Sequence, residues 1–177
     1  MEIVNLRLEG LKLITPRVFK DDRGFFKETY QEDRYGALGI TTRFVQDNHS
    51  FSEKNVIRGM HFQLTPAQDK LVWVTGGKIF DVAVDLRKDS PTFGHWEGVY
   101  LDGDSHTQLF IPTGFAHGFC VVSDGAHVHY KVSSPYNATA EQSFRFDDPT
   151  VQIQWPTNAP ILSQRDRSAP TFLEIVQ

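Results

Sequence analysis

Short apolar stretches separated by turn residues run along almost the whole chain. Their spacing and their β-branched and aromatic residues predict strands. The predicted strands cover residues 11–19, 25–30, 43–50, 56–63, 70–75, 79–86, 96–101, 108–112, 119–122, 127–133 and 142–146. Gly, Pro, Asp and Asn between them favour turns, and Gly76-Gly77 predicts a hairpin. Helices are expected only at 32–38 and as one turn at 161–166. This pattern predicts an all-β sandwich or barrel.

Alternation within residues 79–86 separates two kinds of side chain. One face of this strand carries Phe80, Val82, Val84 and Leu86, and the other carries Ile79, Asp81, Ala83 and Asp85. We therefore expect one face to be core and the other to carry acids.

Residues 55–63, NVIRGMHFQ, place a guanidinium and an imidazole in an otherwise apolar strand. Burying such groups is costly unless they find partners, which predicts a binding site here. Strict alternation would put Arg58 and His61 on opposite faces. Because a strand glycine often marks a bulge, we predict an irregularity at Gly59.

Composition limits the class of protein. The 177 residues, 40% of them apolar and 23% charged, fit a single globular domain over 1–177. A net charge of -4 argues against a nucleic-acid or membrane-surface binder, although a local cationic pocket for a small anion remains possible. The single Cys120 rules out an internal disulfide framework. We find neither a signal peptide nor an apolar run that would span a membrane, so a cytoplasmic location is expected.

Several polar residues have two readings each. Gln46 and Asn48 share a face with Phe44 and Ser50, and they fit either a hydrogen-bonded ligand or a solvated edge. Tyr130 could reach a pocket or fill the core.

The remaining histidines are equally open. His127 and His129 project to the face opposite Tyr130, where a surface or interface pair is favoured over a metal site. His117 follows a glycine-containing turn and could be structural or functional.

The order of these motifs is specific. The sequence runs DDRGFFKETY, FVQDNHS, NVIRGMHFQ, DKLV, IFDVAVDLRKDSPTFG, IPTGFAHGF, the segment 130–141 and DDPTVQIQWP, followed by LSQRD. From about residue 15 to residue 170 it closely resembles the dTDP-4-dehydrorhamnose 3,5-epimerase family. The resemblance implies a cupin-type jelly-roll barrel with a few short peripheral helices, a homodimer, and no metal or organic cofactor. It implies a nucleotide-linked 4-keto-6-deoxyhexose as substrate, inverted at C3 and C5.

The resemblance also implies residue roles. His61 matches the general base, Asp166 the acid that orients it, and Tyr130 the proton donor across the sugar ring. Lys70 matches the cation beside the enolate oxygen, and Asp81 a carboxylate that tunes the charge of the base and the lysine. The substrate-binding set is Arg23, Phe25, Glu28, Gln46, Asp47, Asn48, Arg58, His117, Tyr136, Glu141 and Arg165.

Within that set, Tyr136 matches an aromatic that stacks on the pyrimidine, and Arg165 stands where a lysine is usual. The N-terminal strand with Arg23 and Glu28 is expected to cross to the partner's pocket in the dimer.

Two departures from the family pattern bear on specificity. Trp73 stands where arginine is common, and Asp69 stands where a small residue is commoner, so each is either a specificity determinant or harmless packing. Related enzymes invert C3 alone or C5 alone, or use GDP- or CDP-linked sugars, and the sequence does not choose among them. A metal-dependent cupin enzyme and a non-catalytic sugar-nucleotide-binding module are the alternatives from other classes.

Overall fold

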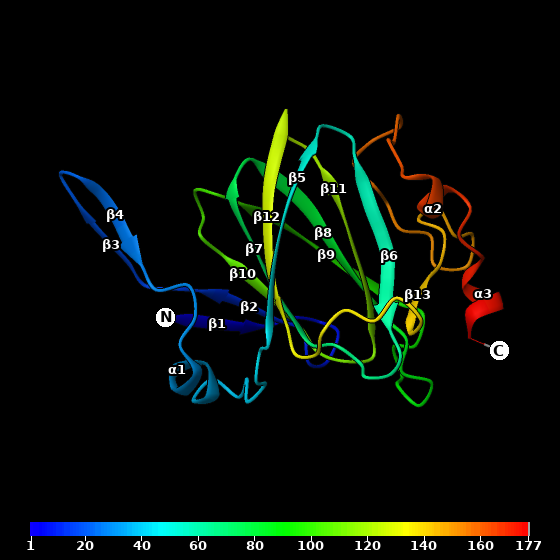
Figure 1. The fold of residues 1–177 in the computed structure, drawn as a ribbon, viewed down its shortest axis with the longest axis horizontal. Coiled ribbons are helices and arrows are strands. Elements are labelled where there is room, and N and C mark those ends of the chain that lie inside the picture. Colours follow the sequence, from blue (N-terminus) through cyan, green and yellow to red (C-terminus); the bar gives the residue numbers. More distant parts are fainter. Residues whose placement is uncertain (177) are drawn as a thin grey trace.

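In a computed structural model that describes residues 1–176, the chain folds into two antiparallel sheets packed face to face (Figure 1). The strands are β1 (Glu2–Asn5), β2 (Lys12–Thr15), β3 (Val18–Asp21), β4 (Gly24–Lys27), β5 (Gln46–Glu53), β6 (Ile57–Gln63), β7 (Lys70–Gly76), β8 (Lys78–Asp85), β9 (Trp96–Asp102), β10 (Gln108–Ile111), β11 (Phe115–Val121), β12 (Gly125–Val132) and β13 (Glu141–Ser143). Three short helices lie at the periphery, α1 (Glu32–Gly36), α2 (Gln164–Arg167) and α3 (Phe172–Ile175). The predicted all-β class is confirmed.

The strand order makes the two sheets the halves of a jelly roll. One sheet has six strands in the order β1-β2-β10-β7-β12-β5, and the other has five in the order β13-β6-β11-β8-β9. The main core lies between them and takes side chains from both, among them Val72 and Val128 from the first sheet and Ala83 and Phe119 from the second. Burial of this apolar surface is the main force that holds the sheets together.

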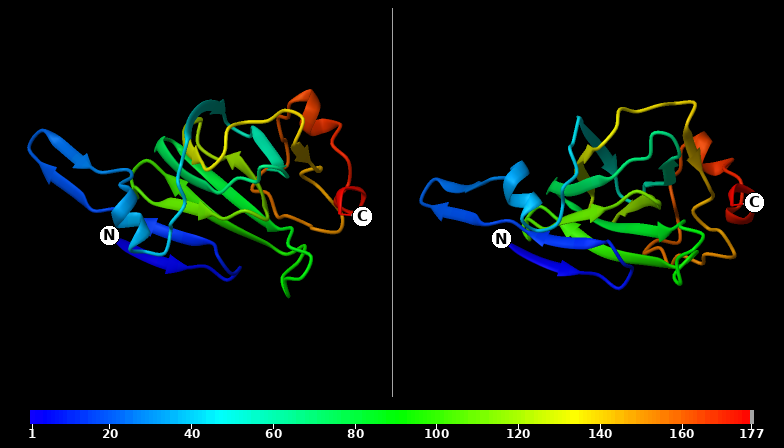
Figure 2. Two further views of the ribbon diagram at one scale, coloured as in Figure 1. Left: turned by 60° about the horizontal axis from the view of Figure 1, so that its bottom comes forward. Right: turned by 90° about the horizontal axis from the view of Figure 1, so that it is seen from below.

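The C-terminal segment covers the outer face of the five-stranded sheet, where α2 and α3 lie beside β6 and β13 (Figures 1 and 2). Phe80, Val82 and Val84 of β8 pack there against Phe144 and Phe172. Both faces of β8 are therefore core, and Asp81 and Asp85 are fully buried. The expectation of a single core face was wrong because alternation cannot reveal a third layer.

The outer face of the six-stranded sheet is only partly covered. α1 and the residues around it pack on Ile14, Leu71 and Phe110. The two-stranded hairpin β3–β4 projects away from the body (Figure 1), and its Phe25 and Phe26 are 57% and 70% exposed.

The Gly76-Gly77 hairpin prediction was also wrong. β7 and β8 belong to different sheets, so this turn carries the chain from one sheet to the other. Gly77 has φ +80°, and a Cβ there would lie 2.0 Å from the carbonyl oxygen of Gly125, so only glycine fits.

Other element boundaries differ in detail from the prediction. Range 11–19 divides into β2 and β3 with Pro16 between them, and β11 begins at Phe115, before the predicted 119. β1 and α3 were not predicted.

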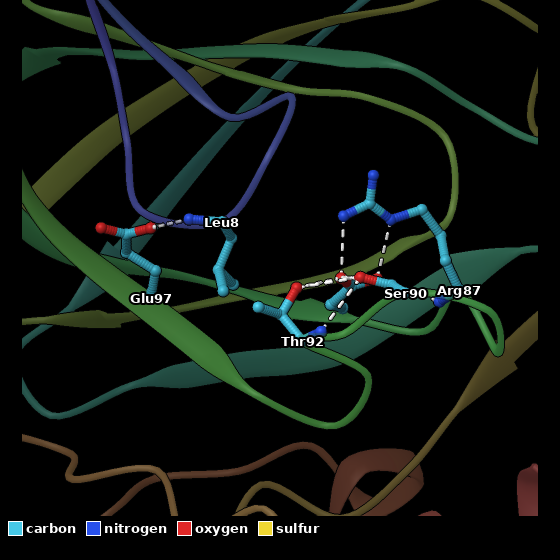
Figure 3. A network of polar contacts seen from close by, with 6 residues as sticks. Leu8, Arg87, Ser90, Thr92 and Glu97 are labelled. Atoms are coloured by element: carbon cyan, nitrogen blue, oxygen red, sulfur yellow. Dashed lines mark hydrogen bonds and ion pairs between the residues drawn. The ribbon is translucent and has the colours of Figure 1, made fainter.

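Carboxylates of β8 and β9 hold neighbouring loops in place (Figure 3). Asp85 accepts hydrogen bonds from Arg87, Ser90 and Thr92 at 2.6 to 2.8 Å. Glu97 of β9 accepts the backbone N–H of Leu8 at 2.8 Å and that of Arg7 at 3.2 Å. In residues 1–176 we find no helix with the length and apolar character needed to cross a membrane.

Candidate active site

A cavity of about 360 Å³ opens between the two sheets. The residues around it are Gln46, Asn48, Ser50, Arg58, His61, Gln68, Lys70, His117, Phe119, Tyr130, Val132, Tyr136 and Glu141. Nine of these are residues predicted from the sequence, and they come from β5, β6, β7, β11, β12 and β13 and the loop before β13. The structure thus brings most of the predicted site together.

An irregularity in β6 lets Arg58 and His61 face the same cavity, as predicted. His61 pairs with His117 and Arg58 with Phe119, so β6 has one residue more than β11 between these pairs. A Cβ on Gly59 would lie 2.6 Å from the Cα of Gly118. The close approach of the two backbones therefore requires glycine at this point of β6.

His61 is paired with Asp166 of α2. Its Nε2 lies 2.5 Å from Oδ1 of Asp166, and Ser163 Oγ accepts the backbone N–H of Asp166 at 3.0 Å. Burial alone would raise the pKa of Asp166, but the hydrogen bond with His61 and the charge of His61 lower it. An ionised Asp166 holds the proton of the imidazole on Nε2, which leaves Nδ1 free to accept a proton.

A second histidine–carboxylate pair lies deeper in the barrel. Nε2 of His117 is 2.9 and 3.0 Å from the two carboxylate oxygens of Asp81, and both residues are buried. The carboxylate of Asp81 therefore contacts His117 directly, and its charge also acts on Lys70.

Lys70 is the first residue of β7 and is 9% exposed. Burial lowers its pKa to about 8, while the charges of Glu141 and Asp81 act in the opposite direction. Within the described part of the chain, the ammonium is held by charge alone, without a hydrogen bond. It is a cation without a close partner, facing the cavity.

Tyr130 of β12 reaches the cavity from the six-stranded sheet. Burial raises the pKa of its phenol; the charge of Arg58 lowers it and that of Glu141 raises it. Tyr130 is therefore protonated at neutral pH and is able to donate a proton.

A hydrogen-bonded rim surrounds the opening of the cavity. Glu141 Oε2 accepts the hydroxyl of Tyr136 at 3.0 Å and pairs with the guanidinium of Arg165. Gln46 accepts the backbone N–H of Tyr136 at 3.1 Å and donates to Asn48 at 2.8 Å. β5 is an edge strand, yet Gln46 and Asn48 line the cavity, so both readings of this pair are partly right.

Four predicted residues lie away from the cavity of their own chain. Arg23 and Phe25 are on the projecting β3–β4 hairpin, and Glu28 follows it and pairs with Arg34. Asp47 is exposed and pairs with Lys131 at 2.7 Å. Its position between Gln46 and Asn48 turns it to the opposite face of β5.

The sequence reasoning did not select four of the residues that line the cavity, Ser50, Gln68, Phe119 and Val132. Ser50 continues the face of Gln46 and Asn48, and Val132 that of Tyr130, so alternation could have identified both. The buried Ser50 hydroxyl finds no hydrogen-bond partner among residues 1–176, which leaves it available to a ligand. No pattern in the sequence indicates that Gln68 and Phe119 line the cavity.

His127 and His129 belong to a stack on the outer face of the six-stranded sheet. His49 lies parallel to His129 at 4.1 Å between ring centroids, Trp73 stacks on the other side at 5.7 Å, and His49 Nε2 is 3.0 Å from His127 Nδ1. The residues that the structure describes contain no group of three or more His, Cys, Asp or Glu positioned to hold a metal ion. Trp73 therefore lies outside the cavity, as part of this histidine stack.

Comparison with known proteins gives a consistent result. The family model described as dTDP-4-dehydrorhamnose 3,5-epimerase matches residues 5–174. The dTDP-4-dehydrorhamnose 3,5-epimerase of Escherichia coli K12 is 46% identical over 100% of this chain and 97% of its own length. The dTDP-4-dehydrorhamnose 3-epimerase of Streptomyces niveus is 42% identical over 98% of this chain and 85% of its own.

Among solved structures, the dTDP-6-deoxy-D-glucose-3,5-epimerase of Legionella pneumophila in complex with dTDP-4-keto-L-rhamnose superposes with a TM-score of 0.95 and 47% identity. The superposition covers 99% of this chain and 94% of that one. The cupin-type jelly roll implied by the sequence is confirmed.

Proposed function

Because the chain belongs to the dTDP-4-dehydrorhamnose 3,5-epimerase family, we propose that it inverts C3 and C5 of dTDP-4-dehydro-6-deoxy-D-glucose to give dTDP-4-dehydro-L-rhamnose. The observation that carries this proposal is that His61, Lys70 and Tyr130 line one cavity. These three groups supply the base, the enolate stabiliser and the acid that an epimerisation next to a ketone requires.

The chemistry follows from the position of the ketone. The C–H bonds at C3 and C5 are both α to C4, so removal of either proton sends the electron pair onto the C4 oxygen. Return of a proton to the opposite face inverts the carbon. Each inversion therefore needs one group that takes a proton and another, across the ring, that gives one.

His61 is the base in this proposal. Asp166 holds the proton on Nε2, so Nδ1 accepts the proton from carbon, and the nearby carboxylate stabilises the imidazolium that forms. His61 then releases this proton to solvent, and the phenolate that Tyr130 has become takes a proton from solvent, before the next abstraction.

Tyr130 and Lys70 complete the transfer. Tyr130 extends from the six-stranded sheet and His61 from the five-stranded sheet, so a sugar ring between the sheets meets them on opposite faces. The raised pKa of Tyr130 keeps its proton in place until the enolate forms. The ammonium of Lys70, without a hydrogen-bonded partner among the described residues, stabilises the negative charge on the C4 oxygen.

The remaining polar groups bind the nucleotide end. We assign Arg58 to the diphosphate because a guanidinium suits two negatively charged phosphate groups. Gln46 and Asn48 offer amides to sugar or base, and Tyr136 at the opening offers a ring for the pyrimidine. His117, held by Asp81, lies at the sugar end, and the Glu141–Arg165 pair closes the rim.

We further propose a homodimer in which the β3–β4 hairpin of one chain reaches the cavity of its partner. An isolated two-stranded hairpin is marginally stable in water, and this one exposes Phe25 and Phe26. Arg23 and Phe25 are absent from the lining of their own cavity, so a role in binding requires a second copy. Glu28 directly follows this hairpin and belongs to the same exchanged segment, which corresponds to the N-terminal strand expected from the sequence to cross to the partner. We also propose that the enzyme works in the cytoplasm.

A second candidate is inversion at C3 alone, which the similarity to the 3-epimerase of Streptomyces niveus supports. Incubation of the protein with dTDP-, GDP- and CDP-linked 4-keto-6-deoxyhexoses in deuterated water, followed by NMR, tests both. We expect deuterium and inversion at C3 and C5 of the dTDP-sugar. Inversion confined to C3 would favour the second candidate, and absence of exchange with all three would refute an epimerase.

A further inference from the structure

Asp69 stands directly before β7 and joins three neighbouring segments. Its Oδ1 accepts the backbone N–H of Thr113 at 2.6 Å, and its Oδ2 accepts the hydroxyl of Thr42. Its backbone N–H donates to Ser133 Oγ at 2.8 Å, and its carbonyl accepts the N–H of Ser133 at 3.1 Å. The carboxylate is used within the protein and is not part of the cavity lining.

The partners of Asp69 each lead to a part of the cavity. Thr113 lies between β10 and β11, which carries His117, and Thr42 precedes β5, which carries Gln46. Ser133 directly follows β12, which carries Tyr130. Asp69 therefore links the ends of four adjacent strands, β10, β7, β12 and β5, at the end of the sheet where β7 begins.

Lys70 is the first residue after this junction. Its backbone pairs with Ile111 of β10 on one side and Val132 of β12 on the other. Within residues 1–176 no hydrogen bond orients the Lys70 ammonium. The position of its Nζ therefore depends on the position of the Lys70 backbone. Asp69 fixes that backbone position.

We propose that Asp69 is a positioning residue that holds Lys70 in register with the C4 oxygen of the substrate. The proposal rests on the function proposed above, in which Lys70 stabilises the enolate. In this proposal the unusual carboxylate before Lys70 positions a catalytic group and does not select among sugars or nucleotides. A displacement of about 1 Å in a catalytic group is enough to reduce a rate by about 100-fold.

Burial gives the proposal a second consequence. Lys70 has its pKa lowered to about 8 because it is enclosed. If loss of the Asp69 contacts loosens the start of β7, water reaches the ammonium and its pKa rises toward the ordinary value. Displacement of Lys70 should therefore appear as a shift of the alkaline limb of activity to higher pH, together with a lower kcat.

The test compares Asp69→Ala and Asp69→Asn with Glu97→Ala. Glu97 is a matched control, because its carboxylate also holds two backbone N–H groups, those of Arg7 and Leu8 (Figure 3), and it does not line the cavity. We expect Asp69→Ala to lower kcat by about 10- to 100-fold, with little change in KM for the dTDP-sugar. Asp69→Asn keeps an oxygen that accepts the N–H of Thr113, so its kcat should fall less than that of Asp69→Ala. Glu97→Ala should lower Tm but keep both kcat and the alkaline limb.

A readout that needs no substrate separates this proposal from the proposed function. The rate at which trinitrobenzenesulfonate modifies Lys70, followed by peptide mass spectrometry across pH, reports the pKa and enclosure of its amine. We expect faster modification and a higher pKa in the Asp69 variants than in the wild type or Glu97→Ala. An inactive wild type would refute the function but leave this comparison valid. Equal Lys70 reactivity in all proteins, or equal loss of kcat in Glu97→Ala, would overturn the positioning role.

Discussion

Nε2 of His61 lies 2.5 Å from Oδ1 of Asp166, so an imidazole of the five-stranded sheet is oriented by a helix that lies outside the barrel. Asp166 is 3% exposed; its carboxylate pairs with His61, while its backbone N–H donates to Ser163 Oγ at the start of α2. In the proposed mechanism the C-terminal segment thus takes part in the reaction as well as in the core.

Asp166→Asn should lower kcat by about 100-fold or more, because an amide neither stabilises the imidazolium nor fixes its tautomer. The rate of deuterium entry at C3 and C5 measures this loss. Ser163→Ala removes the hydroxyl that caps α2 but keeps the carboxylate, and we expect it to retain most of the activity. Equal losses in the two variants would mean that Asp166 only supports the helix.

Activity should fall as the pH rises through about 8. The pKa of Lys70 is lowered to about 8 by burial, and the reaction requires its charged form, which predominates below that pH. A kcat–pH profile measures this fall in activity at alkaline pH. Lys70→Met should lose most of the activity, and the remainder should no longer fall near pH 8. Lys131→Met, on the outer face, serves as the control and should keep the profile. A flat profile to pH 9.5 in the wild type would contradict the role of Lys70.

Exchange of the hairpin predicts complementation between inactive variants. Arg23→Ala and His61→Ala should each be nearly inactive alone, whereas an equal refolded mixture should recover about one quarter of the wild-type sites. The reason is that half of the dimers are mixed, and each mixed dimer has one site with both residues intact. A mixture of His61→Ala with Tyr130→Ala should recover none, because both residues belong to the same chain's cavity. Failure of the first mixture to recover activity would place Arg23 outside the partner's site.

The histidine stack on the six-stranded sheet should make stability depend on pH. Burial, then the neighbouring His49 and His127, lower the pKa of His129, so the folded state binds its proton less readily than the unfolded chain does. Stability from the neutral ring is complete above about pH 6.5 and decreases as the pH falls toward the lowered value. The Tm of the wild type should therefore fall more between pH 7.5 and 5.5 than that of His129→Gln. The same fall in both would refute this linkage.

Local pattern predicted most strands and, through the order of the motifs, the residues that meet in the cavity. It could not predict which sheet a strand joins, because Gly76-Gly77 looks the same in a hairpin and in a crossover. Nor could it predict that the C-terminal segment buries the second face of β8. Both properties depend on contacts distant in sequence.

Side-chain direction was predictable only where the strand is regular. Alternation places Asp47 opposite Gln46 and Asn48, and the structure agrees with alternation rather than with the motif. At Gly59 regular alternation fails, because the bulge in β6 turns Arg58 and His61 to one side. Asp69 shows a further limit, since the sequence reveals the unusual carboxylate but not its contacts with Thr42, Thr113 and Ser133.

The central claim is that His61 removes protons and Tyr130 returns them across one cavity. The most direct test is NMR of dTDP-4-dehydro-6-deoxy-D-glucose in deuterated water with the wild type, His61→Ala and Tyr130→Phe. We expect exchange and inversion at C3 and C5 with the wild type, and no exchange with His61→Ala. Tyr130→Phe should still exchange but fail to invert normally, at least at C5. Full inversion by Tyr130→Phe, or exchange by His61→Ala, would contradict the mechanism.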